Sequence, residues 1–261
     1  MGELDRFRLD GKVALVAGGS GGIGVRLSGA LAAVGADVGI IGRREKGLVE
    51  AQQAVEKAGR AALVLAGDMT READAERVVE ETVGRLGRVD ILINAIGGGA
   101  GAALYAAHEY PQEKWDWILD LNLRTQFNVS KAAAKAMIAG GRGGRVLNVS
   151  SVRGQLGLRA GYSAYVAAKA AMNGLTRQYA TEWAQYGITV NAISPTFVRT
   201  PQVESMLADR DFYEGLVSRI PLGRIADPDD LVGPVLFFCS DASSFCTGQI
   251  LTLDGGLTAT Q

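Results

Sequence analysis

Residues 13–24 read Val-Ala-Leu-Val-Ala-Gly-Gly-Ser-Gly-Gly-Ile-Gly, and this stretch determines the fold that we expect. Residues 13–17 form a short apolar run typical of a buried strand, and a helix is expected to follow near 23–34. The glycines between them permit positive φ angles and a close approach to the backbone. A strand, a glycine turn and a helix in this order predict the first unit of an α/β domain.

Short apolar runs alternate with longer amphipathic stretches along the rest of the chain. Further strands are expected at 37–41, 62–66, 91–94, 146–149, 188–193 and 250–253. Further helices are expected near 44–58, 71–86, 112–138, 163–186 and 228–239. In the helix near 71–86, Thr70 is predicted to be the cap, and Val78, Val79 and Val83 are predicted to form the apolar stripe. The alternation predicts a single α/β domain over residues 1–261: a Rossmann-type, doubly wound parallel sheet of about seven strands with helices on both faces.

Composition excludes several classes of function. The chain has 261 residues, 48% of them apolar, and its 27 basic and 28 acidic residues leave a net charge of −1, which disfavours nucleic acid as a partner. The charged N-terminus and the lack of eighteen consecutive apolar residues predict a cytoplasmic protein outside the membrane. Cys239 and Cys246 are expected to be reduced thiols, and with His108 as the only histidine no metal site is expected.

The glycine turn has the spacing of a dinucleotide-binding loop. Its glycines satisfy both GxGxxG and GxxxGxG, and they lie between a first strand and a first helix. Backbone N–H groups and the positive helix start can hold a pyrophosphate there. The loop residues predicted to contact a dinucleotide are Gly18, Ser20, Gly22, Ile23 and Gly24. The alternative is a glycine turn without a ligand.

The same run also matches the G-x-S-x-G elbow of serine hydrolases, with Ser20 as the nucleophile. That elbow normally follows several strands, whereas only one precedes Ser20. His108 lies in an expected loop without a recognisable acidic partner. A hydrolase is therefore disfavoured.

The end of the second strand indicates which dinucleotide is preferred. NAD-binding folds usually place a carboxylate there for the ribose hydroxyls. This chain has Gly42 followed by Arg43 and Arg44, whose guanidinium groups can pair with a 2′-phosphate. The sequence thus favours NADP(H). The alternative is that the two arginines are solvated at a helix start, in which case NAD(H) is possible.

A tyrosine and a lysine, Tyr165 and Lys169, are expected one turn apart on a long helix that follows a strand ending in Ser150-Ser151. Lysine and a charged nicotinamide ring are predicted to lower the pKa of the phenol, so that it can exchange a proton with an alcohol while hydride is transferred. A serine hydroxyl opposite would hold the substrate oxygen. Tyr110 and Lys114 have the same spacing but no preceding serine-bearing strand, so they are assigned to a helix start near Pro111.

Together these residues resemble the short-chain dehydrogenase/reductase family over essentially the whole chain. The matching pieces are the glycine loop, Asp68, Asn94 to Gly97, Asn122, Ser151, Tyr165, Lys169, Pro195, Thr200 and Asp254-Gly-Gly256. The resemblance implies that Tyr165 is the general acid/base, that Ser151 anchors the substrate oxygen, and that Lys169 and a water connect to Asn122 in a proton relay. It also implies cofactor contacts from Asp68, Met69, Asn94, Gly97, Pro195, Val198 and Thr200.

Three departures from the family pattern are present. Ala95 stands where the family has a second asparagine, and Thr196 stands where it has glycine after Pro195. Ser151 precedes Tyr165 by one residue more than usual, which leaves Ser150 as a weaker candidate. The tail from Arg219 to Asp241 is similar to that of 3-oxoacyl-[acyl-carrier-protein] reductases and gluconate 5-dehydrogenase-like members, which does not name a substrate.

The sequence therefore predicts an NADP(H)-dependent oxidoreductase that interconverts a secondary alcohol and a ketone. The alternatives are the same chemistry with NAD(H) on a sugar acid or polyol, and a non-enzymatic nucleotide-binding scaffold or sensor. The apolar loop at about 196–215 is predicted to cover the substrate, or else to pack as a helical insertion. Arg153 and Arg159 are candidates for binding a substrate anion. Alanine-rich helices and the family resemblance predict a homotetramer, with a dimer second.

Overall fold

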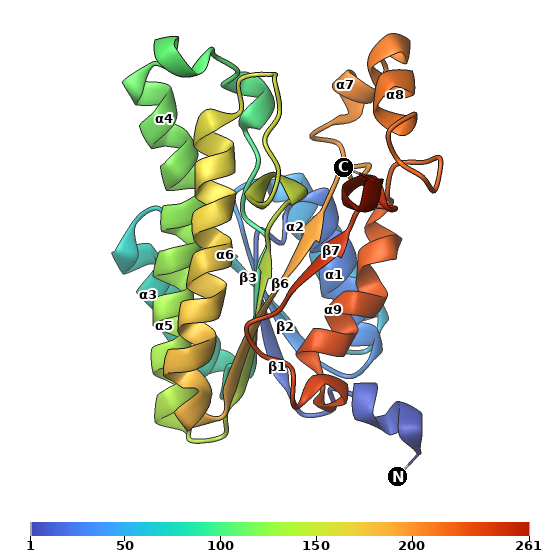
Figure 1. Ribbon diagram of the computed structural model, residues 1–261. Helices are drawn as coiled ribbons and strands as arrows, with labels where there is room; N and C mark the ends of the chain where they lie inside the picture. The colour runs from blue at the N-terminus through green and yellow to red at the C-terminus, as the bar shows by residue number, and fades with distance from the viewer. Residues whose placement is uncertain (1, 261) are drawn as a thin grey trace.

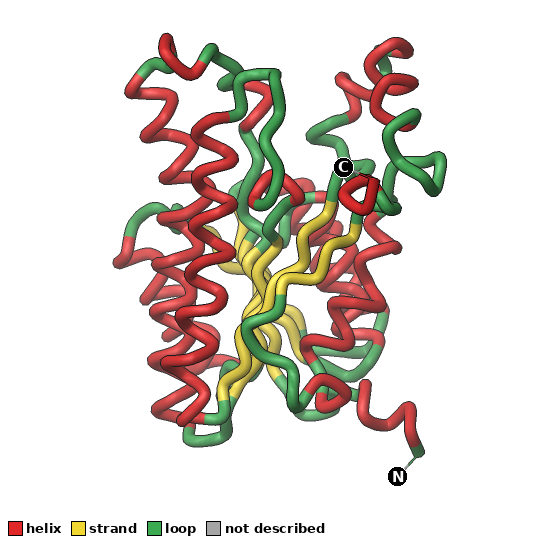
Figure 2. Tube along the Cα trace, in the orientation of Figure 1, coloured by secondary structure: helices red, strands yellow, loops and turns green. Residues whose placement is uncertain are grey.

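The computed structural model describes residues 2–260, and over these residues seven strands form one parallel sheet in the order β3-β2-β1-β4-β5-β6-β7. Figure 1 and Figure 2 show the sheet between two layers of helices, with the C-terminus above the carboxyl ends of the strands. The strands are β1 (Val13–Ala17), β2 (Asp37–Gly42), β3 (Ala62–Ala66), β4 (Ile91–Asn94), β5 (Gly144–Val149), β6 (Ile188–Pro195) and β7 (Ile250–Leu253). The predicted Rossmann-type fold is confirmed.

The helices form two layers. In Figure 1, α3, α5 and α6 cover one face of the sheet, and α1, α2 and α9 cover the other, while α4 lies above the strands beside α6. Their bounds are α1 (Gly22–Ala33), α2 (Glu45–Lys57), α3 (Glu72–Leu86), α4 (Gln112–Leu119), α5 (Thr125–Gly140), α6 (Ser163–Trp183), α7 (Glu204–Leu207), α8 (Arg210–Val217) and α9 (Val232–Cys239). None of the helices in residues 2–260 is long and apolar enough to cross a membrane.

Strand β1 shows why the sheet needs helices on both sides. Every one of its residues is buried. Ala14 and Val16 belong to the apolar cluster under α1, α2 and α9, whereas Leu15 and Ala17 belong to the cluster under α3, α5 and α6. Side chains along a strand alternate between the two faces, so a continuous apolar run requires both faces to be covered.

Two predictions about α3 are wrong. The residue before the helix is Arg71, whose side chain makes no capping hydrogen bond, while the Thr70 hydroxyl donates instead to Asp68 Oδ1 at 2.8 Å. Val78 and Val79 are buried as predicted, but Val83 is 37% exposed. The Thr70 hydroxyl is held by the Asp68 carboxylate in the turn before the helix, and the helix begins one residue later than the predicted cap requires.

The helix predicted near 112–138 is interrupted. Helix α4 passes into a π-helical turn at Asp120–Arg124, and α5 continues from Thr125. Asn122 lies in this π-helical turn and is fully buried. π-Helical turns within longer helices are frequent at functional sites.

The chain from 196 to 217 rises above the carboxyl ends of the strands and contains the short helices α7 and α8 (Figure 1). Its apolar residues pack together in a separate cluster with Ile220 and Ile225. The members from this segment are Phe197, Val203, Leu207, Phe212, Tyr213, Leu216 and Val217. The segment is thus a packed helical insertion at the mouth of the sheet.

Candidate active site

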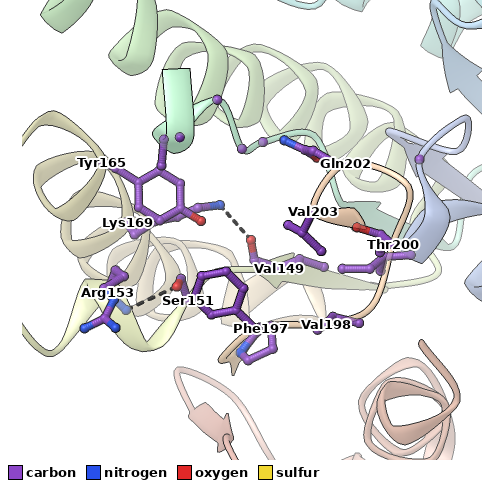
Figure 3. Close-up of a pocket in the computed structure, with 18 of the residues that line it drawn as sticks. Val149, Ser151, Arg153, Tyr165, Lys169, Phe197, Val198, Thr200, Gln202 and Val203 are labelled. Atoms are coloured by element: carbon purple, nitrogen blue, oxygen red, sulfur yellow. Dashed lines mark hydrogen bonds between the residues drawn. The ribbon is translucent and has the colours of Figure 1, made fainter. Parts of the chain in front are cut away.

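A cavity of about 490 Å³ lies at the carboxyl ends of β1, β4, β5 and β6. Neighbouring strands β1 and β4 are followed by connections that leave the sheet in opposite directions, because the order runs from β1 outward to β3 on one side and to β7 on the other. Ligands of doubly wound sheets bind at this switch point. Figure 3 shows the cavity between Tyr165 and Lys169 on one side and Thr200 and Val203 on the other.

The glycine loop forms one end of the cavity, which residues 21–24 line. Gly18 has φ +91°, and a Cβ there would lie 2.6 Å from the carbonyl carbon of Ala95. A Cβ on Gly24 would lie 2.2 Å from the Gly18 oxygen, and one on Gly22 would lie 3.0 Å from Thr200 Cβ. At Gly18 and Gly24 a side chain would collide with the backbone, so these glycines are needed for the tight turn itself, whereas the bare backbone of residues 21–24 at the α1 N-terminus fits an anionic group that approaches closely.

The arginines after β2 lie beside this loop. Arg44 donates from Nη2 to the carbonyl oxygen of Ser20 at 2.9 Å, and both Arg43 and Arg44 are exposed. A Cβ on Gly42 would lie 2.5 Å from Ser20 Oγ, so the serine side chain occupies the place of a side chain at the strand end. Ser20 thus packs against β2 and not in the wall of the cavity, which removes support for a hydrolytic nucleophile.

Lys169 lies on α6 and is 3% exposed, with its side chain directed at the end of β5. Its Nζ donates to the carbonyl oxygen of Val149 at 3.0 Å, and it lies 5.6 Å from the centre of the Tyr165 ring. Burial lowers the pKa of Lys169 to about 8. The predicted proximity of tyrosine and lysine is therefore present.

The electrostatics of Tyr165 differ from the prediction. Burial raises the pKa of Tyr165 to about 12, although a hydrogen bond from Ser151 and the positive charge of Arg153 act in the opposite direction. The protein itself does not lower this pKa, because the loss of hydration outweighs the nearby favourable groups. The predicted lowering also included the charge of a nicotinamide ring, which is not a part of the chain.

The two adjacent serines have different surroundings. Ser151 is 8% exposed, and its Oγ accepts from the backbone N–H of Arg153 at 3.2 Å. The Ser150 hydroxyl donates to the carbonyl oxygen of Lys169 at 3.5 Å and is thereby directed at α6. Both line the cavity, but Ser151 is the serine that acts on Tyr165, where it favours a lower pKa of the phenol.

Asn122 closes the inner side of the site. Its Oδ1 accepts from the N–H of Gly98 at 2.9 Å, and its Nδ2 donates to the carbonyl oxygens of Gly98 and Ile118, both at 3.0 Å. A Cβ on Gly97 would lie 2.8 Å from Asn122 Oδ1 and 3.1 Å from Lys169 Nζ. The structure thus brings Asn122, Gly97 and Lys169 into direct proximity, with the amide fixing the loop after β4.

Three predicted cofactor contacts have side chains that are used elsewhere. Asn94 Nδ2 donates to Ser130 Oγ and to Asn148 Oδ1 in the interior, both at 2.9 Å. The Met69 side chain is 2% exposed in the core. Asp68 Oδ1 accepts from the backbone and the hydroxyl of Thr70. For Asn94 and Met69, only backbone atoms are left to contact a cofactor.

The strand end at β6 contributes as predicted to the wall: Pro195, Val198 and Thr200 all line the cavity. Thr196, which replaces the expected glycine, also lines it, and its Oγ1 is buried without a hydrogen-bond partner among residues 2–260. Ala95 and Ile96 line the opposite side after β4.

Gly97 was predicted to contact the cofactor, but sequence reasoning missed the rest of the loop at 98–102, all of which lines the cavity together with Gly97. Gly98 has φ +111°, and a Cβ there would lie 2.0 Å from Nε2 of Gln202, another missed lining residue. The signal was the position of the glycine run directly after a strand. Of the two candidate anion-binding arginines, Arg153 lines the cavity, whereas Arg159 is exposed and lies outside its wall.

Comparison with known proteins identifies the family. A family described as enoyl-(acyl carrier protein) reductase matches residues 17–258. A short-chain type dehydrogenase/reductase of Mycobacterium marinum has a structure that superposes with a TM-score of 0.91, at 34% identity over 98% of each chain. This chain belongs to the short-chain dehydrogenase/reductase family. As such it is an oxidoreductase of the nicotinamide-dependent kind that acts on CH–OH groups.

Some relatives of this short-chain dehydrogenase/reductase have names that include a substrate, and another is named only as an oxidoreductase. Gluconate 5-dehydrogenase of Gluconobacter oxydans is 37% identical over 99% of both chains. A gluconate 5-dehydrogenase of Burkholderia cenocepacia, solved in complex with NADP and tartrate, has a TM-score of 0.90 at 35% identity over 99% of both chains. An uncharacterized oxidoreductase of Mycobacterium tuberculosis is 40% identical over 98% of this chain and 94% of that protein.

Proposed function

We propose that this enzyme interconverts a secondary alcohol and a ketone with NADP(H), using Ser151, Tyr165, Lys169 and Asn122. The observation that carries the proposal is the position of the phenol and the serine hydroxyl at one end of a cavity whose other end is the glycine loop. A bound nicotinamide ring would supply the acceptor or donor of hydride. Residues 21–24, Pro195, Val198 and Thr200 would hold the dinucleotide along the strand ends.

Each of the four side chains has a separate role in the proposed reaction. Ser151 donates a hydrogen bond to the reacting oxygen, and Tyr165 accepts its proton in oxidation or returns one in reduction. Lys169 places a positive charge 5.6 Å from the centre of the Tyr165 ring, and this charge, together with that of a bound oxidised nicotinamide ring, would favour the phenolate. Asn122 fixes the loop at Gly98 and thereby the position of Gly97 against Lys169.

The Tyr165→Phe variant tests the assignment. It keeps the ring but removes the proton, so turnover should fall by a factor of about 10² to 10⁴, whereas the affinity for NADPH should stay within twofold. The substrates to use are keto-acids, keto-sugars, 3-oxoacyl thioesters and cyclic ketones. Full turnover by Tyr165→Phe would refute the proposed chemistry. If the wild type turns over none of these four substrate classes, the non-enzymatic scaffold or sensor would be favoured.

We propose NADP(H) over NAD(H) because the end of β2 has two exposed arginines and no carboxylate. The Arg43→Ala variant should lose about tenfold in kcat/KM with NADPH and less than twofold with NADH, since only NADPH has the 2′-phosphate. Arg85→Ala, an exposed arginine on α3, is the control. Equal losses with the two cofactors would contradict the proposed preference.

The alternative substrate class is a sugar acid or polyol, with either cofactor. It is supported by the names of the gluconate 5-dehydrogenase relatives, one of which binds NADP and tartrate. Comparing kcat/KM across the substrates named above decides between this class and simpler ketones, because an enzyme for sugar acids should have its highest kcat/KM on the polyhydroxylated acids.

We also propose a cytoplasmic homotetramer, with a dimer as the second choice. Trp117 on α4 and Phe127 on α5 are 43% and 44% exposed, which is typical of side chains covered by a second subunit. Light scattering at micromolar concentration should give about four times 27.4 kDa. A monomeric mass would refute the assembly.

A further inference from the structure

Arg153 is a buried cation in the wall of the cavity. Its residue is 6% exposed, and it follows Ser151 in the short 3-10 turn Val152–Gly154 at the end of β5. Within the described residues 2–260, no carboxylate lies within ion-pair distance of it. Its guanidinium makes one long hydrogen bond, from Nη1 to the carbonyl oxygen of Gly157 at 3.4 Å. A buried charge without a counter-ion is costly, so the missing partner requires an explanation.

The surroundings of Arg153 are positively charged. Burial lowers the pKa of Arg153, and the positive charge of Arg219 acts in the same direction. The remaining groups that act on it are the phenols of Tyr162 and Tyr165. Two arginines and two phenols present hydrogen-bond donors without a matching acid, which is an environment that an anion would neutralise.

The position of Arg153 assigns this anion to the substrate. Figure 3 shows Arg153 beside Ser151, on the opposite side of the cavity from Thr200 and Val203. Thr200 packs against Gly22 of the glycine loop, where the pyrophosphate of a dinucleotide belongs. The phosphates of a bound dinucleotide would thus lie at the far end, and an anion next to Arg153 would lie beside Ser151 and Tyr165, away from the phosphates.

We propose that Arg153 binds the carboxylate of a hydroxy- or keto-acid substrate, with Arg219 adding long-range attraction. A guanidinium can bind both oxygens of a carboxylate in one plane, and a singly charged ligand matches one buried arginine. The proposal rests on the proposed function, because it names the substrate class of the same site. Arg153 is here a specificity-determining residue, and the proton transfer stays with Tyr165.

The test compares acids with uncharged analogues of the same shape. Levulinate, its homologue with one more carbon, and their primary amides are assayed with NADPH, and the ratio of kcat/KM for acid over amide is measured. Wild type should prefer the acids. In Arg153→Gln this ratio should fall by about 10- to 100-fold, and in Arg153→Lys by less, since a charge remains without the planar fork. Arg159→Gln, a matched exposed arginine, should leave the ratio unchanged.

A binding measurement separates this proposal from the chemistry. In the Tyr165→Phe background with NADP⁺ bound, levulinate affinity is measured by calorimetry with and without Arg153→Gln. Weaker levulinate binding with Arg153→Gln supports the carboxylate site even if the enzyme shows no turnover. Failure of the proposed reaction can therefore be distinguished from failure of the carboxylate site. A wild-type enzyme without preference for acids, or an acid-to-amide ratio unaffected in Arg153→Gln, overturns the proposal and leaves Arg153 a structural residue. If Arg153→Gln fails to bind NADPH, the ratio with Arg153→Lys decides in the same way.

Discussion

Replacing Lys169 by methionine should stabilise the protein at neutral pH and abolish turnover. Burial lowers the pKa of this lysine from 10.5 to about 8. That difference corresponds to about 3 kcal/mol of unfavourable free energy for keeping the ammonium charged in the folded state. Methionine is similar in length and has no charge to bury. The hydrogen bond to the Val149 carbonyl at 3.0 Å is lost, which costs about 1 to 1.5 kcal/mol. The net gain at pH 7 should be about 2 kcal/mol.

The pH dependence follows from the sign of the shift. Below pH 8 the lysine is protonated in both states, and the full penalty of burying the charge is present. Between about pH 8 and 10.5 the folded state releases its proton while the unfolded state keeps it, so the stability of the wild type rises with pH. The advantage of Lys169→Met should therefore fade to roughly zero near pH 9.5.

Urea unfolding without cofactor, followed by tryptophan fluorescence at fixed protein concentration, measures this difference. Lys57→Met removes an exposed lysine at the end of α2 and should change stability by less than about 0.5 kcal/mol at either pH. A Lys169→Met protein that is less stable than wild type at pH 7, or that has the same advantage at pH 7 and 9.5, would refute the reasoning from burial. Preserved turnover would refute the functional role of the lysine.

Three more predictions concern the site. In the protein without cofactor, the phenolate absorbance that Tyr165→Phe removes should appear only near pH 12. Binding of NADP⁺ should lower the midpoint of this titration, because a positively charged ring is added. A midpoint below pH 10 in the protein without cofactor would contradict this prediction. Gly97→Ala should lower kcat/KM at least tenfold, since its Cβ would lie 2.8 Å from Asn122 Oδ1. The control is Gly84→Ala on an exposed helix position, which should raise Tm slightly and leave kcat/KM unchanged. Equal kcat/KM of the two variants would show that the contact with Asn122 does not matter. Under limited proteolysis, NADPH with a ketone should protect the segment 196–215, and unchanged cleavage would count against a covering loop.

The sheet was predictable because its signals are local. Apolar runs such as Val13–Ala17 and Ile91–Asn94 are strands with the predicted bounds, and the glycine loop connects the first strand and helix as expected. Both depend on side chains within a few residues of each other. The π-helical turn at Asn122 is different, because its amide bonds to Gly98, which lies 24 positions earlier in the chain. No local pattern records that contact.

Charge and burial were the least predictable properties of the site. Tyr165 and Lys169 were placed correctly on one helix face, but the sequence did not show that burial raises the pKa of the phenol in the protein without a nicotinamide ring, because spacing says nothing about loss of hydration. The two arginines after Ser151 look equivalent in sequence, yet Arg153 is buried and Arg159 is exposed. Tertiary packing decides between them, and with it the candidate for substrate recognition.

The pKa values of Tyr165 and Lys169 indicate how such a site can remain inactive until it is complete. With pKa values of about 12 and about 8, the phenol is neutral at pH 7 and the lysine carries its charge at an energetic cost. A further cation next to the phenol would favour its ionised form, because opposite charges attract strongly where water is excluded. An oxidised nicotinamide ring at the strand ends is such a cation, so the base needed for alcohol oxidation would form only after the hydride acceptor is bound. In reduction the ring is neutral, and a phenol with a high pKa then retains the proton that the nascent alkoxide requires.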